Sequence, residues 1–412
     1  MRIAIIGSGI AGLGAADVLA GAHDVTLFEA APRAGGHVYT VDTDAGPVDM
    51  GFIVHNREHY PQFCALLDRL GIASRPTTMA FSVADGSREW GSGSLSAMFA
   101  DRRNLASPRH WRFLVRVVRF LAQARRDLAG SALATHSLAE YLELREVPRD
   151  VRDHFVIPLA AALWSLAPGL CGAFPAITYF AFLDQHGMLA PDQPLAWHTI
   201  AGGSRRYVDA LLADLQCRRF TLELATPVRS IARANGIIVA TDRGPHRFDR
   251  VIVATHADTA LALLADPTPA ERAALAAFRY SHNRTVLHTD RTFLPRHSAA
   301  HAAWNYVADP DTARVAVTYS MTRLQGLPDR PYLVTLNPRR EPRGILHEVD
   351  FTHPQFDRAA LAARDALVGL AGTLGTYYAG AHFGFGFHED GLRAGTEAAH
   401  RLIADLAIER SA

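Results

Sequence analysis

The sequence predicts an α/β fold that opens with a strand–helix–strand unit, and three features near its start predict it. Residues 3–6 read Ile-Ala-Ile-Ile, an uninterrupted apolar run typical of a buried parallel strand. Residues 7–12 form a glycine-rich turn, and the small residues from 11 to 20 favour a helix directly after it. Residues 24–29 then form a second, largely apolar strand.

Each glycine of the turn meets a separate requirement of a dinucleotide-binding unit. Gly7 allows the tight turn, Gly9 lets the backbone approach a pyrophosphate, and Gly12 lets the helix pack closely on the strand. Glu29 ends the second strand, where its carboxylate can accept hydrogen bonds from both ribose hydroxyls of an unphosphorylated adenosine. A glycine-rich turn is also common between a strand and a helix that bind no nucleotide. The prediction of a dinucleotide site therefore rests on the two flanking strands.

The next segment adds a second glycine pair and a cation. Residues 29–37 read Glu-Ala-Ala-Pro-Arg-Ala-Gly-Gly-His, which places Arg33, Gly35 and Gly36 shortly after the ribose carboxylate. A nicotinamide dinucleotide does not need these residues. The ribityl and phosphate groups of a flavin dinucleotide do need a second glycine-lined approach and a nearby cation. The two motifs together indicate FAD.

With these two motifs the chain resembles the flavin amine oxidase and phytoene desaturase superfamily, which ends in a third motif at its last helix. Residues 376–381 (Thr-Tyr-Tyr-Ala-Gly-Ala) and 384–395 match that motif, a strand that leads through a glycine-rich turn into a helix beneath the flavin. Weaker matches fall in family order along the chain. They are residues 51–52, 202–204, 226–228 and 251–255.

The resemblance implies a non-covalently bound FAD and a set of residues that hold it. These residues are Gly7, Gly9, Ile10, Ala11, Gly12, Glu29, Ala30, Arg33, Gly35, Gly36, His37, Val38, Gly51, Phe52, Val228, Ala254, Gly380, Ala381, Glu389, Asp390, Gly391 and Leu392.

A narrower resemblance concerns a bacterial subgroup of predicted flavoproteins. Residues 51–54, 202–205 and 386–393 look like the corresponding segments of that subgroup, which is associated with unusual fatty-acyl modification, including methylated and cyclopropane acyl chains. This resemblance implies an acyl substrate.

The resemblance also implies the architecture, a discontinuous, Rossmann-like FAD-binding domain with a second, mixed α+β substrate domain of the amine oxidase type. Strand-like runs at 314–319 and 332–336 belong to the second domain. The expected FAD-binding parts are 1–71, 202–277 and 368–412, and the expected substrate parts are 72–201, mainly helical, and 278–367, mainly sheet.

Composition excludes several classes of protein. The 412 residues, 49% of them hydrophobic, can bury a large core, and the net charge of +1 gives no overall attraction to nucleic acid. Cys64, Cys171 and Cys217 are widely spaced, so neither a CxxC redox pair nor a metal site is predicted. The first strand begins at the first residues and no leader pattern precedes it, so we expect a cytoplasmic protein.

The chain contains no lysine, because all 42 residues of the Lys+Arg count are arginine. Schiff-base chemistry and a phosphate-binding P-loop lysine are therefore excluded. Many flavin amine oxidases also place a lysine, through a water, near flavin N5. The matching stretch here, 282–285, offers only an asparagine or an arginine, and the aromatic cage for an amine is not evident in 383–388.

A basic segment and an uncharged segment follow each other in the predicted substrate domain. Residues 102–126 hold eight arginines and no acid, with an apolar stripe of Trp111, Leu114, Val115, Val118 and Leu121 predicted on the face opposite the arginines. The helix either turns its basic face to water or lies on an anionic bilayer, at the inner face of the membrane. Residues 155–183 lack any charge, but their prolines argue against a membrane span, which leaves core or an apolar channel to the flavin.

Few side chains are candidates for catalysis. By resemblance, His388 and Glu389 lie beside the flavin, where His388 could move a proton. The alternative is that Glu389 or Asp390 caps a helix. The residues expected at the substrate are His55, Asn56, Trp164, Phe180, Trp304 and Tyr306.

These observations lead to a functional hypothesis with two alternatives. The leading hypothesis is an FAD-dependent dehydrogenase or desaturase that passes a hydride from an apolar, fatty-acyl or phospholipid acyl substrate to flavin N5 and a proton to His388 or water. Electrons would leave to oxygen, a quinone or a protein. The alternatives are a flavin oxidase of a polyamine or aromatic amine, and a non-redox FAD-dependent hydratase, isomerase or binding protein.

Overall fold

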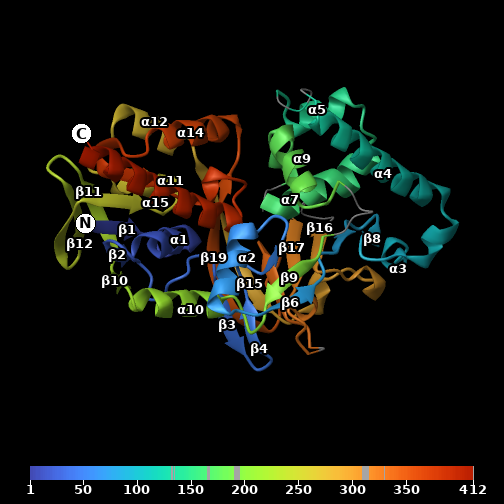
Figure 1. The fold of residues 1–412 in the computed structure, drawn as a ribbon. Helices are drawn as coiled ribbons and strands as arrows, with labels where there is room; N and C mark the ends of the chain where they lie inside the picture. Colours follow the sequence, from blue (N-terminus) through green and yellow to red (C-terminus); the bar gives the residue numbers. More distant parts are fainter. Residues whose placement is uncertain are drawn as a thin grey trace.

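The computed structural model describes residues 1–130, 133, 135–164, 168–189, 195–308, 315–328 and 330–411. Two lobes lie side by side (Figure 1). One is built on a five-stranded parallel sheet and the other on a seven-stranded sheet under a helical cap. The predicted α/β fold is confirmed.

The parallel sheet contains the first strand of the chain at its centre. All its neighbouring strands are parallel, and its order is β10-β2-β1-β14-β20. The strands are β10 (Phe220–Glu223), β2 (Asp24–Phe28), β1 (Arg2–Ile6), β14 (Arg250–Val253) and β20 (Thr376–Tyr378). The predicted apolar runs at 3–6 and 24–29 are therefore β1 and β2.

Both faces of this sheet are covered, as its uninterrupted apolar strands require. Ile3 and Ile5 face a layer of helices, and Ala4 and Ile6 face the opposite layer. The first layer consists of α1 (Ile10–Leu19), α2 (Pro61–Leu70), α10 (Arg205–Gln216) and α15 (His388–Ser411). The second consists of α11 (Ala257–Leu263), α12 (Pro269–Ala276), α14 (Arg358–Gly369) and a sheet of β11 (Val228–Ala232), β12 (Ile237–Thr241) and β13 (Gly244–Phe248).

A fully buried ion pair joins this second layer to the sheet. The guanidinium of Arg233, directly after β11, donates to Glu271 at 2.5 and 2.9 Å and to Asp266 at 2.8 Å. The Tyr378 hydroxyl donates to Glu271 at 2.6 Å. Burial alone would raise the pKa of Glu271, but the hydrogen bonds from Arg233 and Tyr378 lower it to about 2. Glu271 therefore stays ionised, and Arg233 compensates its buried negative charge.

The seven-stranded sheet draws strands from two distant stretches of the chain. Its order is β19-β15-β18-β17-β16-β7-β8, and β16 and β7 form its parallel pair. The strands are β7 (Phe81–Ala84), β8 (Glu89–Gly91), β15 (Arg279–His288), β16 (Trp304–Ala308), β17 (Val315–Ser320), β18 (Leu333–Leu336) and β19 (Ile345–Gln355). The strands predicted near 314–319 and 332–336 are β17 and β18. The division of the chain into domains stays a prediction.

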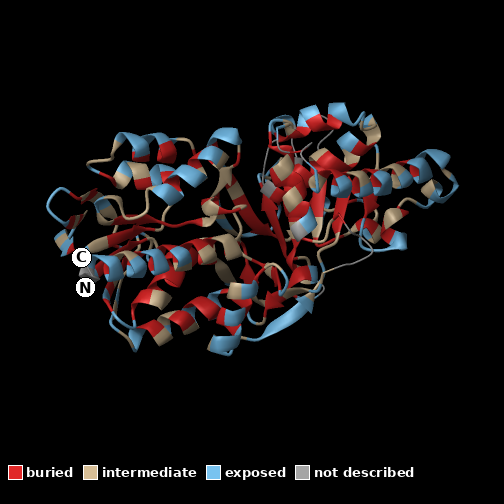
Figure 2. Cartoon of the chain, turned by 45° about the horizontal axis from the view of Figure 1, so that its top comes forward, coloured by how far each residue is buried: buried red, intermediate tan, exposed pale blue. Residues whose placement is uncertain are grey.

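A helical cap covers one face of the seven-stranded sheet. Buried residues gather where the two meet (Figure 2), in a cluster that includes Phe113, Phe180 and Tyr306. The cap consists of α4 (Pro108–Leu128), α5 (Leu138–Leu144), α6 (Arg149–Val151), a π-helical turn (Arg152–Val156), α7 (Ile157–Trp164), α8 (Pro168–Cys171) and α9 (Ala176–Gln185). In the described part of the chain no helix is both long and apolar enough to span a membrane.

The orientation of α4 differs from the prediction. Phe113, Val117 and Phe120 face the core, whereas Trp111 and Val118 are exposed. Leu121 is buried as expected. The helix carries two apolar stripes, and the one that contains Phe113, Val117 and Phe120 packs inward.

Short elements lie between the two lobes. The carboxylate of Asp49 accepts hydrogen bonds from Thr40, from the backbone and hydroxyl of Ser204, and from Gln325. Asp49 thus ties the start of α10 to the seven-stranded lobe. The remaining short elements, within the lobes and between them, are β3 (Thr40–Thr43), β4 (Gly46–Asp49), β5 (Val54–Asn56), β6 (Ser74–Thr77), β9 (Trp197–Ile200), α3 (Leu95–Met98), α13 (Met321–Leu324) and the 3₁₀ turns Arg102–Ala106, Arg291–Phe293, Ser298–Ala300, Thr373–Gly375 and Ala381–Phe383.

We expect Arg233→Ala to lower the free energy of unfolding by about 3–5 kcal/mol, because it leaves the Glu271 carboxylate buried without its partner. Arg229→Ala, on the adjoining strand, is the matched control. Arg229 makes a two-point ion pair with Asp242, but both side chains are exposed, so its loss should lower the free energy of unfolding far less. Urea unfolding of both variants measures the difference. Equal losses would contradict the account.

Candidate active site

A single cavity of about 620 Å³ joins the two lobes. Its lining includes Gly7, Glu29, Ala254 and Gly380, which follow the carboxyl ends of β1, β2, β14 and β20. Ligands of open parallel sheets bind at this edge. The lining continues onto the seven-stranded sheet and its cap, for example at Trp304. The cavity therefore has a glycine-rich end and a far end.

The glycine-rich end is shaped to receive an anion. Gly9 is the N-cap of α1 and has no side chain to cap the first N–H groups of the helix, which are open to a ligand. A Cβ atom at Gly9 would meet no protein atom within 4 Å, whereas one at Gly12 would lie 1.9 Å from the carbonyl oxygen of Gly7. Gly12 is therefore required by the protein's own packing. Gly9 instead leaves open space in front of the helix.

Glu29 lies at the end of the cavity expected to hold the ribose. One carboxylate oxygen accepts hydrogen bonds from the backbone N–H and the hydroxyl of Ser8, at 2.9 and 2.6 Å. The other accepts the N–H of Ala31 at 2.8 Å. These bonds fix the carboxylate in the lining of the cavity, where the remaining lone pairs of its oxygens can accept ribose hydroxyls.

Arg33 organises the second glycine pair. Its guanidinium donates to the carbonyl oxygens of Gly36 and Val38, at 2.9 and 2.8 Å, and lies over the ring of Tyr39. A Cβ atom at Gly36 would lie 3.0 Å from Cα of Gly9, so the two glycine-rich turns touch. Arg33 thus holds the backbone that forms the second wall of the anion site.

The predicted cofactor residues divide into those that line the cavity and those behind it. Gly7, Gly9, Ile10, Ala11, Glu29, Arg33, Gly35, Gly36, His37, Gly51, Phe52, Ala254, Gly380, Ala381 and Gly391 line it. Gly12, Ala30, Val38, Val228, Glu389, Asp390 and Leu392 are not among the lining residues. Their contacts with a cofactor stay predictions.

Both acidic residues at the start of α15 cap backbone N–H groups. The carboxylate of Glu389 accepts from the backbone N–H groups of Gln62 and Phe63, both at 2.9 Å, and so caps the N-terminus of α2. Asp390 accepts from the backbone N–H groups of Phe385 and Phe387. Capping, the alternative raised from the sequence, is the interaction that the structure records for both side chains. Glu389 is bound to α2 and is poorly placed for catalysis.

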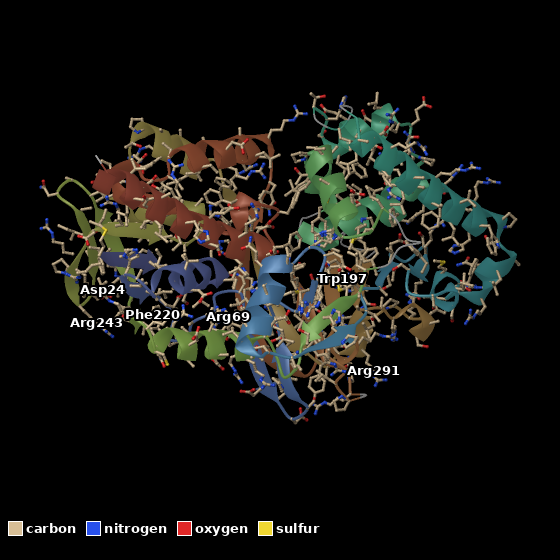
Figure 3. The ribbon with its side chains drawn as sticks, viewed as in Figure 1. Asp24, Arg69, Trp197, Phe220, Arg243 and Arg291 are labelled. Carbon is tan, nitrogen blue, oxygen red and sulfur yellow. The ribbon has the colours of Figure 1, made fainter. Side chains whose placement is uncertain are left out.

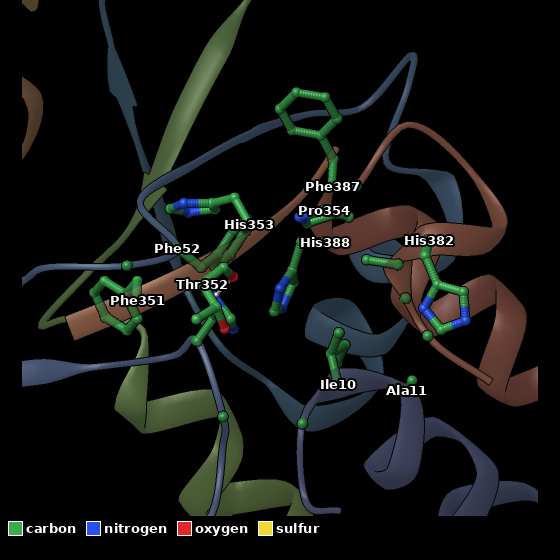
Figure 4. A pocket seen from close by; sticks show the side chains of 18 of the residues that line it. Ile10, Ala11, Phe52, Phe351, Thr352, His353, Pro354, His382, Phe387 and His388 are labelled. Carbon is green, nitrogen blue, oxygen red and sulfur yellow. Dashed lines mark hydrogen bonds between the residues drawn. The ribbon is translucent and has the colours of Figure 1, made fainter. Parts of the chain in front are cut away.

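His388 forms part of the cavity wall as a neutral imidazole. Its ring, beside the cavity in Figure 4, stacks on Phe52 with centroids 3.7 Å apart. Its Nε2 lies 2.7 Å from the hydroxyl of Tyr207. Burial, with smaller effects of His37 and His55, holds the pKa of His388 well below its usual range. The residue is therefore uncharged at neutral pH.

Five more histidines line the cavity, and only His37 was anticipated from the sequence. Burial lowers the pKa of His37 and of His382 to about 3 and that of His186 and of His353 to about 4, and it also lowers the pKa of His256. The described ranges contain no cluster of three or more His, Cys, Asp or Glu side chains able to hold a metal ion. The histidines form a polar but uncharged wall.

The orientation of His353 is set by Asn283. The side-chain nitrogen of Asn283 donates to the carbonyl oxygen of Ser281 at 3.1 Å. Because a carbonyl oxygen only accepts, this bond establishes the orientation of the Asn283 amide. The same nitrogen lies 2.8 Å from Nδ1 of His353, so Nδ1 accepts and the neutral ring carries its proton on Nε2. Asn337 donates to the amide oxygen of Asn283 at 2.8 Å. Asn283 thus occupies a position in the stretch where many flavin amine oxidases are expected to have a lysine.

Arg284, the other polar residue that the sequence offered there, points away from the cavity. It forms exposed ion pairs with Glu341 and Glu348, at 2.9 and 2.6 Å. Alternation along β15 explains the difference, because neighbouring residues of a strand face opposite sides of the sheet.

The far end of the cavity is mostly apolar and aromatic. Phe182 and Phe387 stack face to face with centroids 4.5 Å apart, and Trp197 of β9 lies near the middle of the molecule (Figure 3). The apolar and aromatic lining includes Ile53, Val54, Met79, Leu163, Phe182, Met188, Trp197, Trp304, Tyr319, Leu336, Val349, Phe351, Phe356, Phe385 and Phe387.

Of the residues predicted at the substrate whose side chains are described, Trp304 lines this end. Phe180 and Tyr306 pack in the core under the cap. His55 and Asn56 are buried on β5, whereas their neighbours Ile53 and Val54 line the cavity. The side chain of Trp164 lies outside the described residues. Contact of these four residues with a substrate stays a prediction, and the sequence did not show which way their strands and helices face.

The uncharged segment 155–183 contributes to both the core and the cavity. Leu163 and Phe182 line the cavity, whereas Tyr179 and Phe180 are buried among the cap helices. The two interpretations of this segment, channel wall and core, therefore apply to different faces of the same helices.

Comparisons with known proteins agree with this geometry. A family model described as flavin containing amine oxidoreductase matches residues 10–344. The fold is similar to that of a CLA-producing fatty acid isomerase from P. acnes, with a TM-score of 0.71, 18% identity, and 97% of this chain and 98% of that chain covered. It is also similar to cyclohexylamine oxidase from Brevibacterium oxydans IH-35A, with a TM-score of 0.72, 17% identity, and 98% and 99% covered. A putative protoporphyrinogen oxidase from Exiguobacterium sp. 255-15 matches with a TM-score of 0.67, 18% identity, and 98% and 99% covered.

We expect Gly9→Ala to fold normally and yet to lose affinity for FAD by at least about tenfold, because the new Cβ fills the space in front of α1 that a pyrophosphate must enter. Circular dichroism reports the fold, and the ratio of flavin to protein absorbance reports binding. Gly21→Ala is the control, since a Cβ there also meets no atom within 4 Å but lies far from the cavity. A Gly9→Ala protein that keeps its flavin would refute this assignment of the site.

The buried histidines predict acid instability. A histidine with a depressed folded pKa stays neutral in the folded protein but takes up a proton in the unfolded chain below about pH 6.5, so stability is lost as the pH falls. Each such residue should contribute about 1.4 kcal/mol per pH unit between its two pKa values. His382→Leu should remove one such contribution, since the pKa of His382 is lowered to about 3 by burial.

Chemical denaturation of the holoprotein between pH 7 and pH 5 tests this prediction. His282→Leu is the control, because His282 is exposed. The slope of unfolding free energy against pH should decrease in His382→Leu and stay unchanged in His282→Leu. Identical slopes in all three proteins would show that His382 does not titrate as described.

Proposed function

The chain belongs to the family of flavin-containing amine oxidoreductases, and on this premise we propose that it is an FAD-dependent oxidoreductase that removes hydrogen from an apolar, fatty-acyl substrate. One observation carries the proposal: the cavity that begins at the glycine-rich turn continues without interruption into an apolar and aromatic compartment. A cavity of this kind binds chiefly through burial of apolar surface.

The residues of the glycine-rich end suit FAD. Gly9 and Gly36 would hold the pyrophosphate and the chain next to it, and Glu29 would hold the ribose. The gap that a Cβ at Gly9 would fill is the structural support for this assignment. We propose that the FAD is held non-covalently, as the family resemblance implies.

A bound flavin supplies a two-electron acceptor, and the protein supplies the surroundings. The apolar wall, for example Leu336 and Phe351, aligns an acyl chain. The Nε2–H group of His353 is a hydrogen-bond donor in the same cavity. Because burial makes the lining imidazoles weak bases, we expect the proton released by the substrate to leave to water and not to remain on His388.

Oxidation of an amine is the second candidate. Asp350 lines the cavity and carries the carboxylate that a distal ammonium group would seek. Against this, Phe387 already stacks on Phe182, so these two rings leave no slot between them for an amine. Asn283 also stands where many relatives are expected to place a lysine. The acyl substrate is therefore favoured.

One similar structure is a fatty acid isomerase, and an isomerase would use the same apolar compartment. The two activities differ in their products. Dehydrogenation lowers the product mass by two hydrogens and reduces the flavin, whereas isomerisation changes neither. Addition of water would raise the mass and indicate a hydratase.

We expect long-chain acyl substrates to bleach the yellow flavin of the purified holoprotein under anaerobic conditions, and soluble amines to leave it unchanged. Leu336→Glu should slow bleaching at least about tenfold, because it places a polar or charged group in the apolar compartment. Leu346→Glu, at an exposed leucine on β19 of the same sheet, is the matched control. Flavin content shows whether each variant is folded.

Bleaching by an amine with release of peroxide would replace the acyl proposal by amine oxidation. Acyl substrate recovered with an unchanged mass and a moved double bond would replace it by isomerisation.

A further inference from the structure

The outer face of α4 carries an apolar stripe that nothing in the described structure covers. Trp111, Val115 and Val118 lie at helical spacing on one side of the helix and are 49%, 46% and 58% exposed. A helix that merely faces water would carry polar residues there. The inner side already uses a separate stripe, with Phe113 and Phe120 packed in the core.

Neighbouring elements extend the stripe into a surface. Nε1 of Trp111 donates to the carbonyl oxygen of Leu105 at 3.0 Å, and its ring packs on Phe99 with centroids 4.7 Å apart. Leu95, the first residue of α3, lies one helical turn before Phe99 and is 76% exposed. Leu105 is also exposed. Exposed apolar side chains gathered in this way mark an interaction site more often than chance exposure does. We call the set Leu95, Leu105, Trp111, Val115 and Val118 the α4 surface.

Arginines frame the α4 surface. The chain as a whole has a net charge of +1, yet residues 102–126 hold eight arginines and no acid. Arg112 and Arg119 each follow a residue of the apolar stripe and lie two turns apart on the same side of the helix. Nitrogen-tipped side chains project from the outer side of α4 (Figure 3).

Most of these arginines are free to meet an external anion. Arg103 pairs with Asp101 and Arg116 with Asp150. No ion pair is recorded within the described ranges for Arg109, Arg112, Arg119 or Arg125. The surface thus combines apolar side chains at its centre with unneutralised positive charge around them.

We propose that the α4 surface docks on an anionic lipid bilayer. Trp111, Val115 and Val118 enter the boundary between headgroups and acyl chains, and Arg112 and Arg119 bind lipid phosphates. Tryptophan is enriched at this depth of a bilayer, and the ring of Trp111 offers a large apolar surface. Basic amphipathic helices bind anionic membranes by burying apolar side chains and by electrostatic attraction. A nucleic acid would use the arginines but leave the exposed Trp, Val and Leu side chains in water.

The docking proposal does not depend on the reaction. If the acyl substrate proposed above is correct, docking also brings the protein to its source of acyl chains. The two proposals fail separately, because vesicle binding needs no turnover and flavin bleaching can be measured with detergent-dispersed substrate.

Vesicle co-sedimentation of the holoprotein tests docking directly. We expect vesicles of phosphatidylcholine with phosphatidylglycerol to bind the protein at least about tenfold more tightly than vesicles of phosphatidylcholine alone, with the difference reduced by salt. Arg112→Glu/Arg119→Glu should abolish the preference for the anionic vesicles. Trp111→Ser/Val118→Ser should weaken binding to them by about tenfold while keeping the salt dependence.

Matched changes elsewhere on the surface are the controls. Val368→Ser removes an exposed valine of α14, and Arg229→Glu/Arg247→Glu reverses two exposed arginines of β11 and β13. Neither should change vesicle binding, and flavin absorbance should be the same in all variants. Equal binding to neutral and anionic vesicles, an equal effect of the control variants, or binding to double-stranded DNA without binding to vesicles would overturn the proposal.

Discussion

Backbone segments from distant parts of the chain pack closely around the turn between β1 and α1, and each of these close contacts involves a glycine. A Cβ at Gly395 of α15 would lie 1.9 Å from the carbonyl oxygen of Ala11, and one at Gly36 would lie 3.0 Å from Cα of Gly9. Gly7 itself has a φ of +101° and sits against the carbonyl of Ala254. This close backbone packing lets three distant segments of the chain meet around one small space. The anion site, the position of α15 and the mouth of the apolar compartment all follow from it.

The same arrangement separates the chemistry of the two ends of the cavity. Backbone N–H groups and one fixed carboxylate, Glu29, serve a polar, charged ligand at one end. Residues of the seven-stranded sheet and one face of the cap helices supply apolar surface at the other. Between them stand histidines whose pKa values burial keeps low, so the middle of the cavity is polar without being charged. Such a site favours a substrate that is itself uncharged near the reacting atoms.

Local sequence predicted what local geometry determines. The glycine turns, β1, β2 and the α/β class depend on residues close together in the chain, and the structure agrees with each. What depends on long-range contacts could not be predicted. Glu389 caps α2, which lies more than 300 residues away in the sequence, and Asn283 orients His353 across a strand pair. In α4 the periodicity predicted an amphipathic helix, but it could not show which of two apolar stripes, that of Phe113 or that of Trp111, would face the core.

The central claim is that the apolar end of the cavity receives an acyl chain and that hydrogen leaves that chain. Mass spectrometry of membrane lipids from cells with and without this protein tests the claim most directly. Cells that carry the Gly9→Ala variant serve as the control for a protein without bound FAD. The account predicts acyl chains lighter by two hydrogens, or later products of such chains, only when the active protein is present. An acyl profile that is identical in all three cell lines would contradict it.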